Sequence, residues 1–183
     1  QEVYMWRQHR AFEIDYRKSI TEIHDDWVTE FRPAYNQWKI IPLNKEDPIP
    51  EIPQTKKIAE ISVPGYEIVP AKTRGDMQKW SEEMHNCISG YYSTAADPNA
   101  EATYLGIYRN GALFANVEIR KGVVKQFLGK YNKTFSDERF EEVTPILEEW
   151  LKAGVVKNDF RRTWGFDGSR ANEFVVRGTA LRM

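Results

Sequence analysis

The sequence has very little cysteine: Cys87 is the only one among 183 residues. A single cysteine cannot form an internal disulfide, so a disulfide framework is excluded and a reducing, cytoplasmic setting is expected. Long apolar runs are lacking as well. No stretch approaches the roughly 20 consecutive apolar residues that a membrane-spanning helix needs, and no signal peptide is visible. We therefore expect no membrane partner.

Net charge is also scarce, at −1 from 26 basic and 27 acidic residues. Without a strong overall field, binding to nucleic acid requires a local basic patch. Apolar residues, in contrast, make up 41% of the chain and include six Trp, which argues against disorder. The length suits one domain, or one domain with a sizeable extension. Because the sequence begins with Gln1 and not with Met, we treat it as a candidate fragment of a longer protein.

Residues 1–39 are predicted to form a helical N-terminal extension, and residues 40–64 a proline-rich connector. Apolar residues of the extension recur at spacings of three and four, which places them on one helix face. These residues are Tyr16, Ile20, Ile23, Trp27 and Phe31. The connector contains Pro42, Pro48, Pro50, Pro53 and Pro64. Such a density of proline favours an extended strap and not a helix.

Residues 65–154 are predicted to form an α+β core, in which helices cover a small antiparallel meander of three to four strands. Asn110-Gly111 and Lys121-Gly122 indicate tight hairpin turns. The strands that these turns connect are Tyr104–Arg109, Ala112–Arg120 and Val123–Leu128, and a further short strand is expected at Tyr66–Val69.

Two helices of this core can be placed by their ends. The first is expected from Thr73 to Cys87, with Thr73 as the N-cap and Asp76 completing a capping box. The second is expected to have Thr144 as its N-cap and Pro145 at its first position, and to end at Gly154. Residues 155–183 follow as an irregular tail that is basic and aromatic.

The strand register follows if both hairpin turns have two residues. Tyr104 then pairs with Val117, and Val117 pairs with Gln126. This register places Gln126 among apolar neighbours and places Glu118 opposite Lys125 as a favourable charged pair. A buried amide without hydrogen-bond partners costs roughly 1–3 kcal/mol. We therefore expect Gln126 to mark a polar network or the wall of a pocket.

The segment from Met84 to Tyr91 (Met-His-Asn-Cys-Ile-Ser-Gly-Tyr) resembles the His-Asn-Cys-Val-Gly-x-Tyr signature of PcfJ-like proteins, with Ser89 where Gly is usual. Further similar segments are Ile23–Trp27, Tyr104–Tyr108, Ala115–Ile119 and Gln126–Asn132. The resemblance covers roughly residues 19–151, and the tail has no recognised counterpart. It implies an association with conjugative plasmids, phages and other mobile elements, but it implies no particular biochemical activity.

One functional hypothesis is a cysteine-dependent enzyme with Cys87 as nucleophile. His85 or His24 would act as the base, and Gln126 or Asn132 as polar stabilisers. Helix geometry weakens the nearest pair, because residues two positions apart diverge by about 200° around a helix axis. A helix C-terminus also disfavours a thiolate. A structural Cys87 is the commoner alternative. A zinc site would need more ligands than the spacing offers, so no metal and no cofactor are expected.

The second hypothesis, which we favour, is an accessory protein that binds DNA, RNA or a protein partner. The loop Gly129–Lys133 offers cations for phosphates and an aromatic ring for a stacked base. The tail offers a similar mixture of basic and aromatic residues. The candidate nucleic-acid-binding residues are Lys130, Tyr131, Lys133, Arg161, Arg162 and Trp164. The alternative for the tail is that its aromatic residues pack on the body of the protein.

Overall fold

The computed structural model describes residues 44–167, 170 and 171. These residues belong to a compact unit that begins at Asn44. The predicted N-terminal extension, His24 within it, and the rest of the tail lie outside the described residues.

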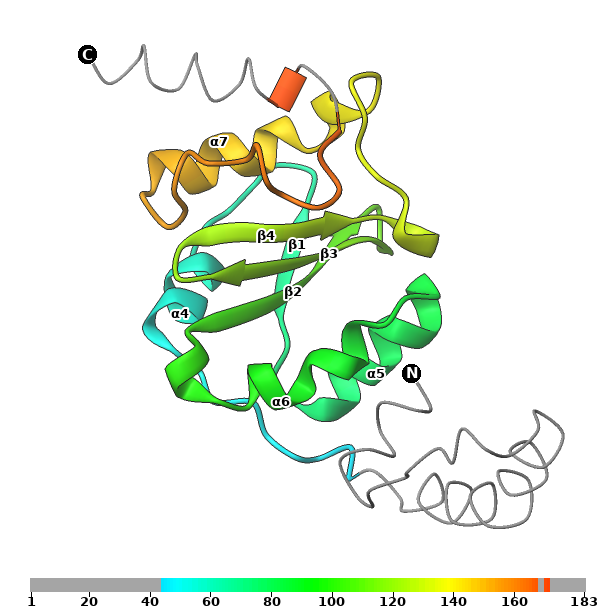
Figure 1. Ribbon diagram of the computed structural model, residues 1–183, viewed down its shortest axis with the longest axis vertical. Coiled ribbons are helices and arrows are strands. Elements are labelled where there is room, and N and C mark those ends of the chain that lie inside the picture. The colour runs from blue at the N-terminus through cyan, green and yellow to red at the C-terminus, as the bar shows by residue number, and fades with distance from the viewer. Residues whose placement is uncertain (1–43, 168–169, 172–183) are drawn as a thin grey trace, which may run out of the picture. The chain divides into compact units, whose positions relative to one another are not determined.

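A four-stranded antiparallel sheet with the strand order β1-β2-β3-β4 forms the centre of this unit (Figure 1). The strands are β1 (Glu67–Pro70), β2 (Ala102–Arg109), β3 (Ala112–Arg120) and β4 (Val123–Leu128). The turns after β2 and β3 have positive φ at both central residues, as type I′ hairpin turns require. The predicted α+β class and the antiparallel meander are thus confirmed.

The predicted register is wrong by one residue, because each hairpin contains a β-bulge. Phe114 is the extra residue between the pairs Tyr108–Leu113 and Ile107–Ala115. Lys125 is the extra residue between the pairs that Ile119 and Glu118 make with β4. One inserted residue moves all later pairs by one position.

As a result Val117 pairs with Leu105 and with Phe127, and not with Tyr104 and Gln126. Gln126 lies opposite Glu118, so the expected Glu118–Lys125 pair does not form. Since neighbouring residues of a strand face opposite sides, this shift moves Gln126 away from the apolar face of the sheet.

The apolar face of the sheet is covered by α7 (Thr144–Lys152) and by the tail (Figure 1). The core on this face includes Leu105, Val117, Phe127, Ile146, Trp150, Phe160 and Phe166. Pro145 lies in the first turn of α7, and Gly154 follows the helix with a φ of 70°. Gly154 therefore has the predicted role, whereas the predicted N-cap is wrong by one residue: Val143 is the N-cap, and Thr144 is the first residue of the helix.

The opposite face is covered by α5 (Arg74–Met84) and α6 (Tyr92–Ala95) (Figure 1). Thr73 and Asp76 form the predicted capping box of α5. Trp80 packs directly on Gly106, since a Cβ at this glycine would lie 2.7 Å from the indole ring. However, α5 ends at Met84, and His85 takes a left-handed conformation with a φ of 50°. The expected helix through Cys87 is therefore wrong at its C-terminal end.

Short 3-10 turns connect the larger elements. They are η2 (Ile88–Tyr91), η3 (Pro98–Ala100), η4 (Lys130–Asn132) and η5 (Phe140–Glu142). Cys87 lies immediately before η2 and not within a helix. The side chain of Cys87 is consequently positioned by the turn between α5 and η2.

The proline-rich connector contains α4 (Pro53–Ala59), so the expectation of an extended strap throughout is wrong. Pro53 lies in the first turn of this helix, where a missing N–H removes no helical hydrogen bond. Ile58 of α4 is fully buried in the core, and Thr55 shares a hydrogen bond of 2.7 Å with Thr103. The connector is thus part of the packed domain from Asn44 onward.

The tail packs beside β4. Trp164 N donates to Lys125 O at 2.9 Å, and Phe127 N donates to Trp164 O at 2.8 Å, in parallel orientation. Gly165 has a φ of 109°, and a Cβ there would lie 1.9 Å from the carbonyl oxygen of Phe127. Phe160 and Phe166 are buried, as the packing interpretation of the tail expects.

Candidate functional site

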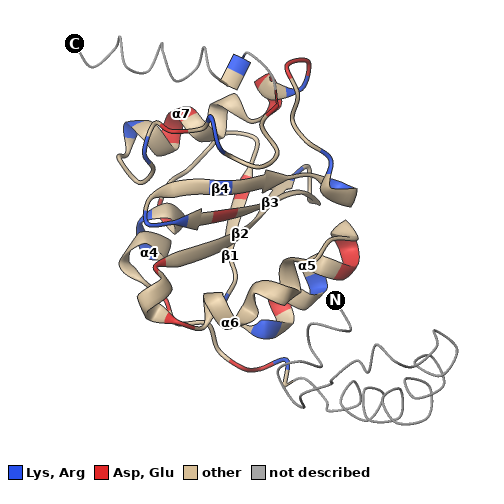
Figure 2. Ribbon diagram, viewed as in Figure 1, with Lys and Arg blue, Asp and Glu red and all other residues tan. Residues whose placement is uncertain are grey.

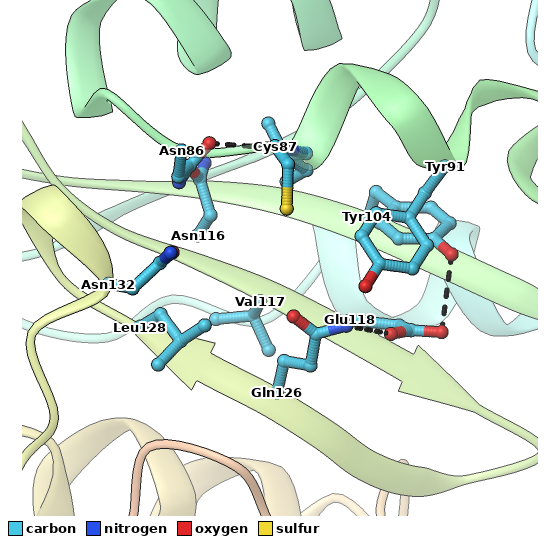
Figure 3. Close-up of a pocket in the computed structure, with 11 residues that line it drawn as sticks. Asn86, Cys87, Tyr91, Tyr104, Asn116, Val117, Glu118, Gln126, Leu128 and Asn132 are labelled. Carbon is cyan, nitrogen blue, oxygen red and sulfur yellow. Dashed lines mark hydrogen bonds between the residues drawn. The ribbon is translucent and has the colours of Figure 1, made fainter. Parts of the chain in front are cut away.

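A small pocket with both polar and apolar lining residues, which we call the Cys87 pocket, lies where α5 ends above β3 and β4 (Figure 3). The empty space in and in front of it is about 310 Å³, but the enclosed part holds only about one or two water-sized groups. The Cys87 thiol is exposed, and its sulfur points into the pocket. The other lining residues are Asn86, Ile88, Tyr91, Tyr104, Asn116, Val117, Glu118, Gln126, Leu128 and Asn132. The pocket thus brings together three of the predicted catalytic residues, Cys87, Gln126 and Asn132.

Glu118 is the centre of a buried hydrogen-bond network at the inner wall of this pocket. Its side chain is only 5% exposed. The carboxylate accepts hydrogen bonds from Tyr104 Oη at 3.2 Å, from Arg120 Nη2 at 2.5 Å and from Gln126 Nε2 at 2.7 Å. Burial, and then the negative charge of Glu118, raise the pKa of Tyr104 above its ordinary value. Gln126 is therefore both part of a polar network and part of a pocket wall.

Asn86 and Asn116 form a second polar contact at the other side of the pocket. Asn86 Nδ2 donates to Asn116 Oδ1 at 2.9 Å, and Asn86 Oδ1 accepts from Ile88 N at 3.2 Å. This amide therefore ties the turn that carries Cys87 to strand β3. Asn116 is 4% exposed, and its Nδ2 has no hydrogen-bond partner among the described residues. A buried donor of this kind is rare in proteins and calls for an explanation.

His85 does not lie in the Cys87 pocket. Its ring stacks on Tyr131, with ring centroids 4.8 Å apart and an angle of 4° between the planes. The left-handed conformation of His85 ends α5 and separates its side chain from that of Cys87. The structure thus does not bring the His85 and Cys87 side chains together as a catalytic pair, and His24 lies outside the described residues.

A wider concave surface, which we call the basic groove, adjoins the turn after β4. Figure 2 shows basic residues in this turn, where the chain leaves the sheet. The groove is lined by Arg109, Ala112, Leu113, Phe114, Gly129, Lys130, Asn132, Lys133, Thr134 and Arg139. Four of these residues are cationic, and none is acidic. Lys130 and Lys133 are exposed, as the nucleic-acid hypothesis requires.

The two arginines of the groove are held in place by Glu142. Arg109 Nη1 lies 2.9 Å and Arg139 Nε 2.7 Å from its carboxylate oxygens. Partial burial alone would raise the pKa of Glu142, but hydrogen bonds and charge from Arg139 and Arg109 outweigh burial and lower this pKa. Each guanidinium also lies over a ring, Arg109 at 4.2 Å from Phe114 and Arg139 at 4.8 Å from Phe135. These contacts fix both charges at the groove wall.

The turn Lys130–Asn132 separates the two sites. Tyr131 and Asn132 both have positive φ, at 58° and 56°. Such backbone strain in consecutive residues other than glycine persists only where the surroundings hold it. Asn132 lines both the Cys87 pocket and the basic groove. The two sites are therefore neighbours.

The remaining predicted nucleic-acid-binding residues lie elsewhere. Arg161, Arg162 and Trp164 line neither the Cys87 pocket nor the basic groove. All three are exposed, and Trp164 retains 48% of its surface. Tyr131, in contrast, is 60% exposed beside the groove residues Lys130 and Asn132.

Sequence reasoning missed several residues of the two sites. Asn116, Tyr91, Arg109 and Arg139 were not candidates. Asn116 and Arg109 reach the two sites only through the folded sheet, and Tyr91, although four residues after Cys87, was noted only as part of the family signature. Asn86 was visible only as part of the His-Asn-Cys segment. The bulge in β3 interrupts the alternation of the strand at Phe114 and Ala115. This interruption is the only sequence signal of the bulge, and it is weak because Ala115 is small.

The described part of the chain contains neither a cluster of metal-binding side chains nor a membrane-spanning helix. In residues 44–167, 170 and 171, no three His, Cys, Asp or Glu side chains gather around a possible metal position. Over the same residues, no helix has the length and apolar character needed to cross a membrane.

Comparison with known proteins gives a family but no characterised relative. No curated protein and no solved structure shows significant similarity to the chain. A family model described as PcfJ-like protein matches residues 8–144, which include every residue that lines the Cys87 pocket or the basic groove. The match covers well over half of the sequence, and the chain therefore belongs to the family of PcfJ-like proteins.

Proposed function

We propose that this protein is a cytoplasmic accessory protein of a mobile genetic element and that it binds single-stranded DNA or RNA in the basic groove. The observation that carries this proposal is the lining of the groove, which has four cationic side chains and no carboxylate. The mobile-element setting comes from the family resemblance and not from the groove itself.

The charges of the groove suit a phosphate backbone. Glu142 offsets one of the four positive charges, which leaves a net excess of three. Arg109 and Arg139 are held by this carboxylate, so they present fixed donors. Lys130 and Lys133 are exposed and can follow a flexible backbone. Such a mixture of fixed and mobile cations neutralises phosphates without reading sequence.

The aromatic residue at the groove favours a single strand over a duplex. Tyr131 is exposed, and its ring is stacked in parallel on the ring of His85. Unpaired bases stack on exposed rings of this kind, whereas paired bases are already stacked on each other. The stack with His85 holds the Tyr131 ring in one orientation before a base arrives.

Salt-dependent binding tests this proposal. Binding of labelled single strands and of a duplex is measured by fluorescence anisotropy at several salt concentrations. We expect single strands to bind more tightly, and we expect the double variant Lys130→Gln/Lys133→Gln to reduce the slope of log K against log salt by about 1.4, since each lost phosphate contact removes about 0.7.

The matched control is the double variant Lys56→Gln/Lys57→Gln in α4, where both lysines are exposed and lie outside the groove. This variant should bind as the unmodified protein does. Equal losses in both double variants, or binding that does not depend on salt, would contradict the proposal.

The cysteine-dependent enzyme has less support. The exposed Cys87 thiol within a pocket favours it. However, a nucleophilic cysteine needs a base within hydrogen-bond reach, and the His85 ring stacks on Tyr131 instead. A Cys87→Ser variant that loses all biological activity while it retains strand binding would favour the enzyme over the binding protein.

A further inference from the structure

We infer that the Cys87 pocket receives the polar edge of one unpaired nucleobase from the strand that the basic groove holds. This inference rests on the proposed function and assigns a second site to the same ligand. Phosphates would lie in the groove, and one base would turn across Asn132 into the pocket.

The first support is the position of the pocket beside the groove. Asn132 lines both sites. Its neighbour Tyr131 carries the exposed ring and stacks on His85, which lies two residues before Cys87. A strand whose backbone follows Lys130 and Lys133 therefore passes the mouth of the pocket.

The second support is the chemistry of the pocket wall, which has hydrogen-bonding groups but no uncompensated charge. Glu118 is paired with Arg120, and its two oxygens also accept hydrogen bonds from Tyr104 and Gln126. The pocket is thus suited to a neutral polar group and not to an ion.

Two groups of the wall remain available to such a ligand. Asn116 Nδ2 is a buried donor without a partner among the described residues. Gln126 uses its Nε2 for Glu118, and Figure 3 shows its amide oxygen turned toward the pocket. One available donor and one available acceptor match the edge of a nucleobase, which presents both.

The third support is the shape of the pocket. Leu128, which pairs with Asn116, gives it an apolar floor, and the Tyr91 ring lies at its side (Figure 3). The enclosed part of the pocket has room for only about one or two water-sized groups. The polar edge atoms of a base can therefore enter it while the ring stays at the mouth, whereas a bulky group cannot enter.

The single cysteine provides a direct test, because thiol alkylation can occur only at Cys87. The rate of reaction with iodoacetamide is followed by intact mass in the presence of two strands of about 20 nucleotides, longer than the site of one small domain. One strand is oligo-dT, and the other has the same phosphates but only abasic positions. At about ten times the Kd of each strand, we expect oligo-dT to slow alkylation about tenfold by mass action. The abasic strand should leave the rate unchanged.

The possible outcomes separate the two proposals. If both strands bind and neither protects Cys87, nucleic-acid binding in the basic groove is supported, but binding of a base in the Cys87 pocket is contradicted. Equal protection by both strands would mean that the backbone covers the pocket, which also overturns the inference. If neither strand binds at low salt, the proposed function and this inference both fall.

A variant at Asn132 gives a second test. Asn132→Gly removes the amide but tolerates the positive φ of this position. Because no charge is lost, the salt slope of binding should stay the same. The difference in affinity between oligo-dT and the abasic strand should shrink. An unchanged difference in this variant would contradict a path across Asn132.

Discussion

The two faces of the sheet are made by alternate residues of the same strands, and they differ in composition. Strand β3 contributes Ala115, Val117 and Ile119 to the face below α7, and Asn116 and Glu118 to the face below α5. The first face is filled by an aromatic cluster, and the second carries the buried amide of Asn116 and the buried carboxylate of Glu118. Buried polar groups rarely improve stability over apolar ones, so a polar face indicates a role other than packing.

The apolar face should show the largest effect on stability. The Phe127 side chain is fully buried, and its ring centroid lies 5.3–5.4 Å from those of Phe166 and Phe135. Phe127→Ala should lower the free energy of unfolding by about 3–5 kcal/mol, because it leaves a cavity. Denaturant unfolding measures this loss. The exposed Tyr131 is the control, and Tyr131→Ala should change stability by less than about 0.5 kcal/mol.

A glycine substitution tests how tightly the tail closes this same face. Gly165→Ala places a methyl group 1.9 Å from the Phe127 carbonyl oxygen at a φ of 109°. Backbone strain alone costs about 1–3 kcal/mol, and the collision adds to this loss of unfolding free energy. Gly111→Ala is the control, since φ is 75° there but nothing lies within 4 Å of the added Cβ. Equal losses at both positions would show that the tail is not closely packed.

On the polar face, Glu118→Gln removes a charge that accepts three hydrogen bonds. We expect a loss of about 1.5–3 kcal/mol in the free energy of unfolding, because Arg120 loses its charged partner. Glu149→Gln makes the same chemical change in a solvated pair, where Lys152 Nζ lies 3.7 Å away. Surface pairs contribute little, so less than about 1 kcal/mol is expected. If the Glu118→Gln protein were as stable as the Glu149→Gln protein, the buried Glu118 network would contribute no more to stability than the surface pair does.

The smallest effect on the free energy of unfolding is expected for Tyr104, and it should appear only at alkaline pH. Burial and the charge of Glu118 raise the pKa of Tyr104 in the folded protein, whereas in the unfolded chain it stays near about 10. Stability should therefore be complete below pH about 10 and fall as pH rises from there toward the folded-state pKa, because the unfolded chain releases the proton first. Thermal unfolding of Tyr104→Phe should show a shallower alkaline decline than the unmodified protein. An identical decline in both would place the titrating group elsewhere.

The limits of sequence prediction follow the distance between the residues involved. The ends of β3 and β4 and the capping box of α5 were predicted correctly, because each depends on a few neighbouring residues. The register was wrong because bulges depend on tertiary contacts. The bulged Lys125, for example, presents its carbonyl oxygen to Trp164 N, which comes from the tail. No local pattern reveals such a partner.

The same reasoning applies to the candidate site. Cys87, Gln126 and Asn132 were recognised as residue types with useful chemistry, and the structure places them around one pocket. Their roles were less predictable. Gln126 reached the pocket wall only because the bulges turned it away from the apolar face. Helix geometry already argued against His85 as the partner of Cys87, but the reason in the structure is different. A left-handed residue at the end of α5 directs the His85 ring to Tyr131.

The tail beside β4 also affects how the protein behaves in solution. Trp164 uses the N–H of Phe127 and the carbonyl of Lys125, which are the outward-facing backbone groups of this strand. A truncation before Thr163 would leave these groups unpaired along a sheet edge that is otherwise protected. Exposed edges of this kind pair with further strands from other molecules. Shortened forms of the chain should therefore self-associate. In the full chain, the tail covers the edge of β4 and prevents this intermolecular strand pairing.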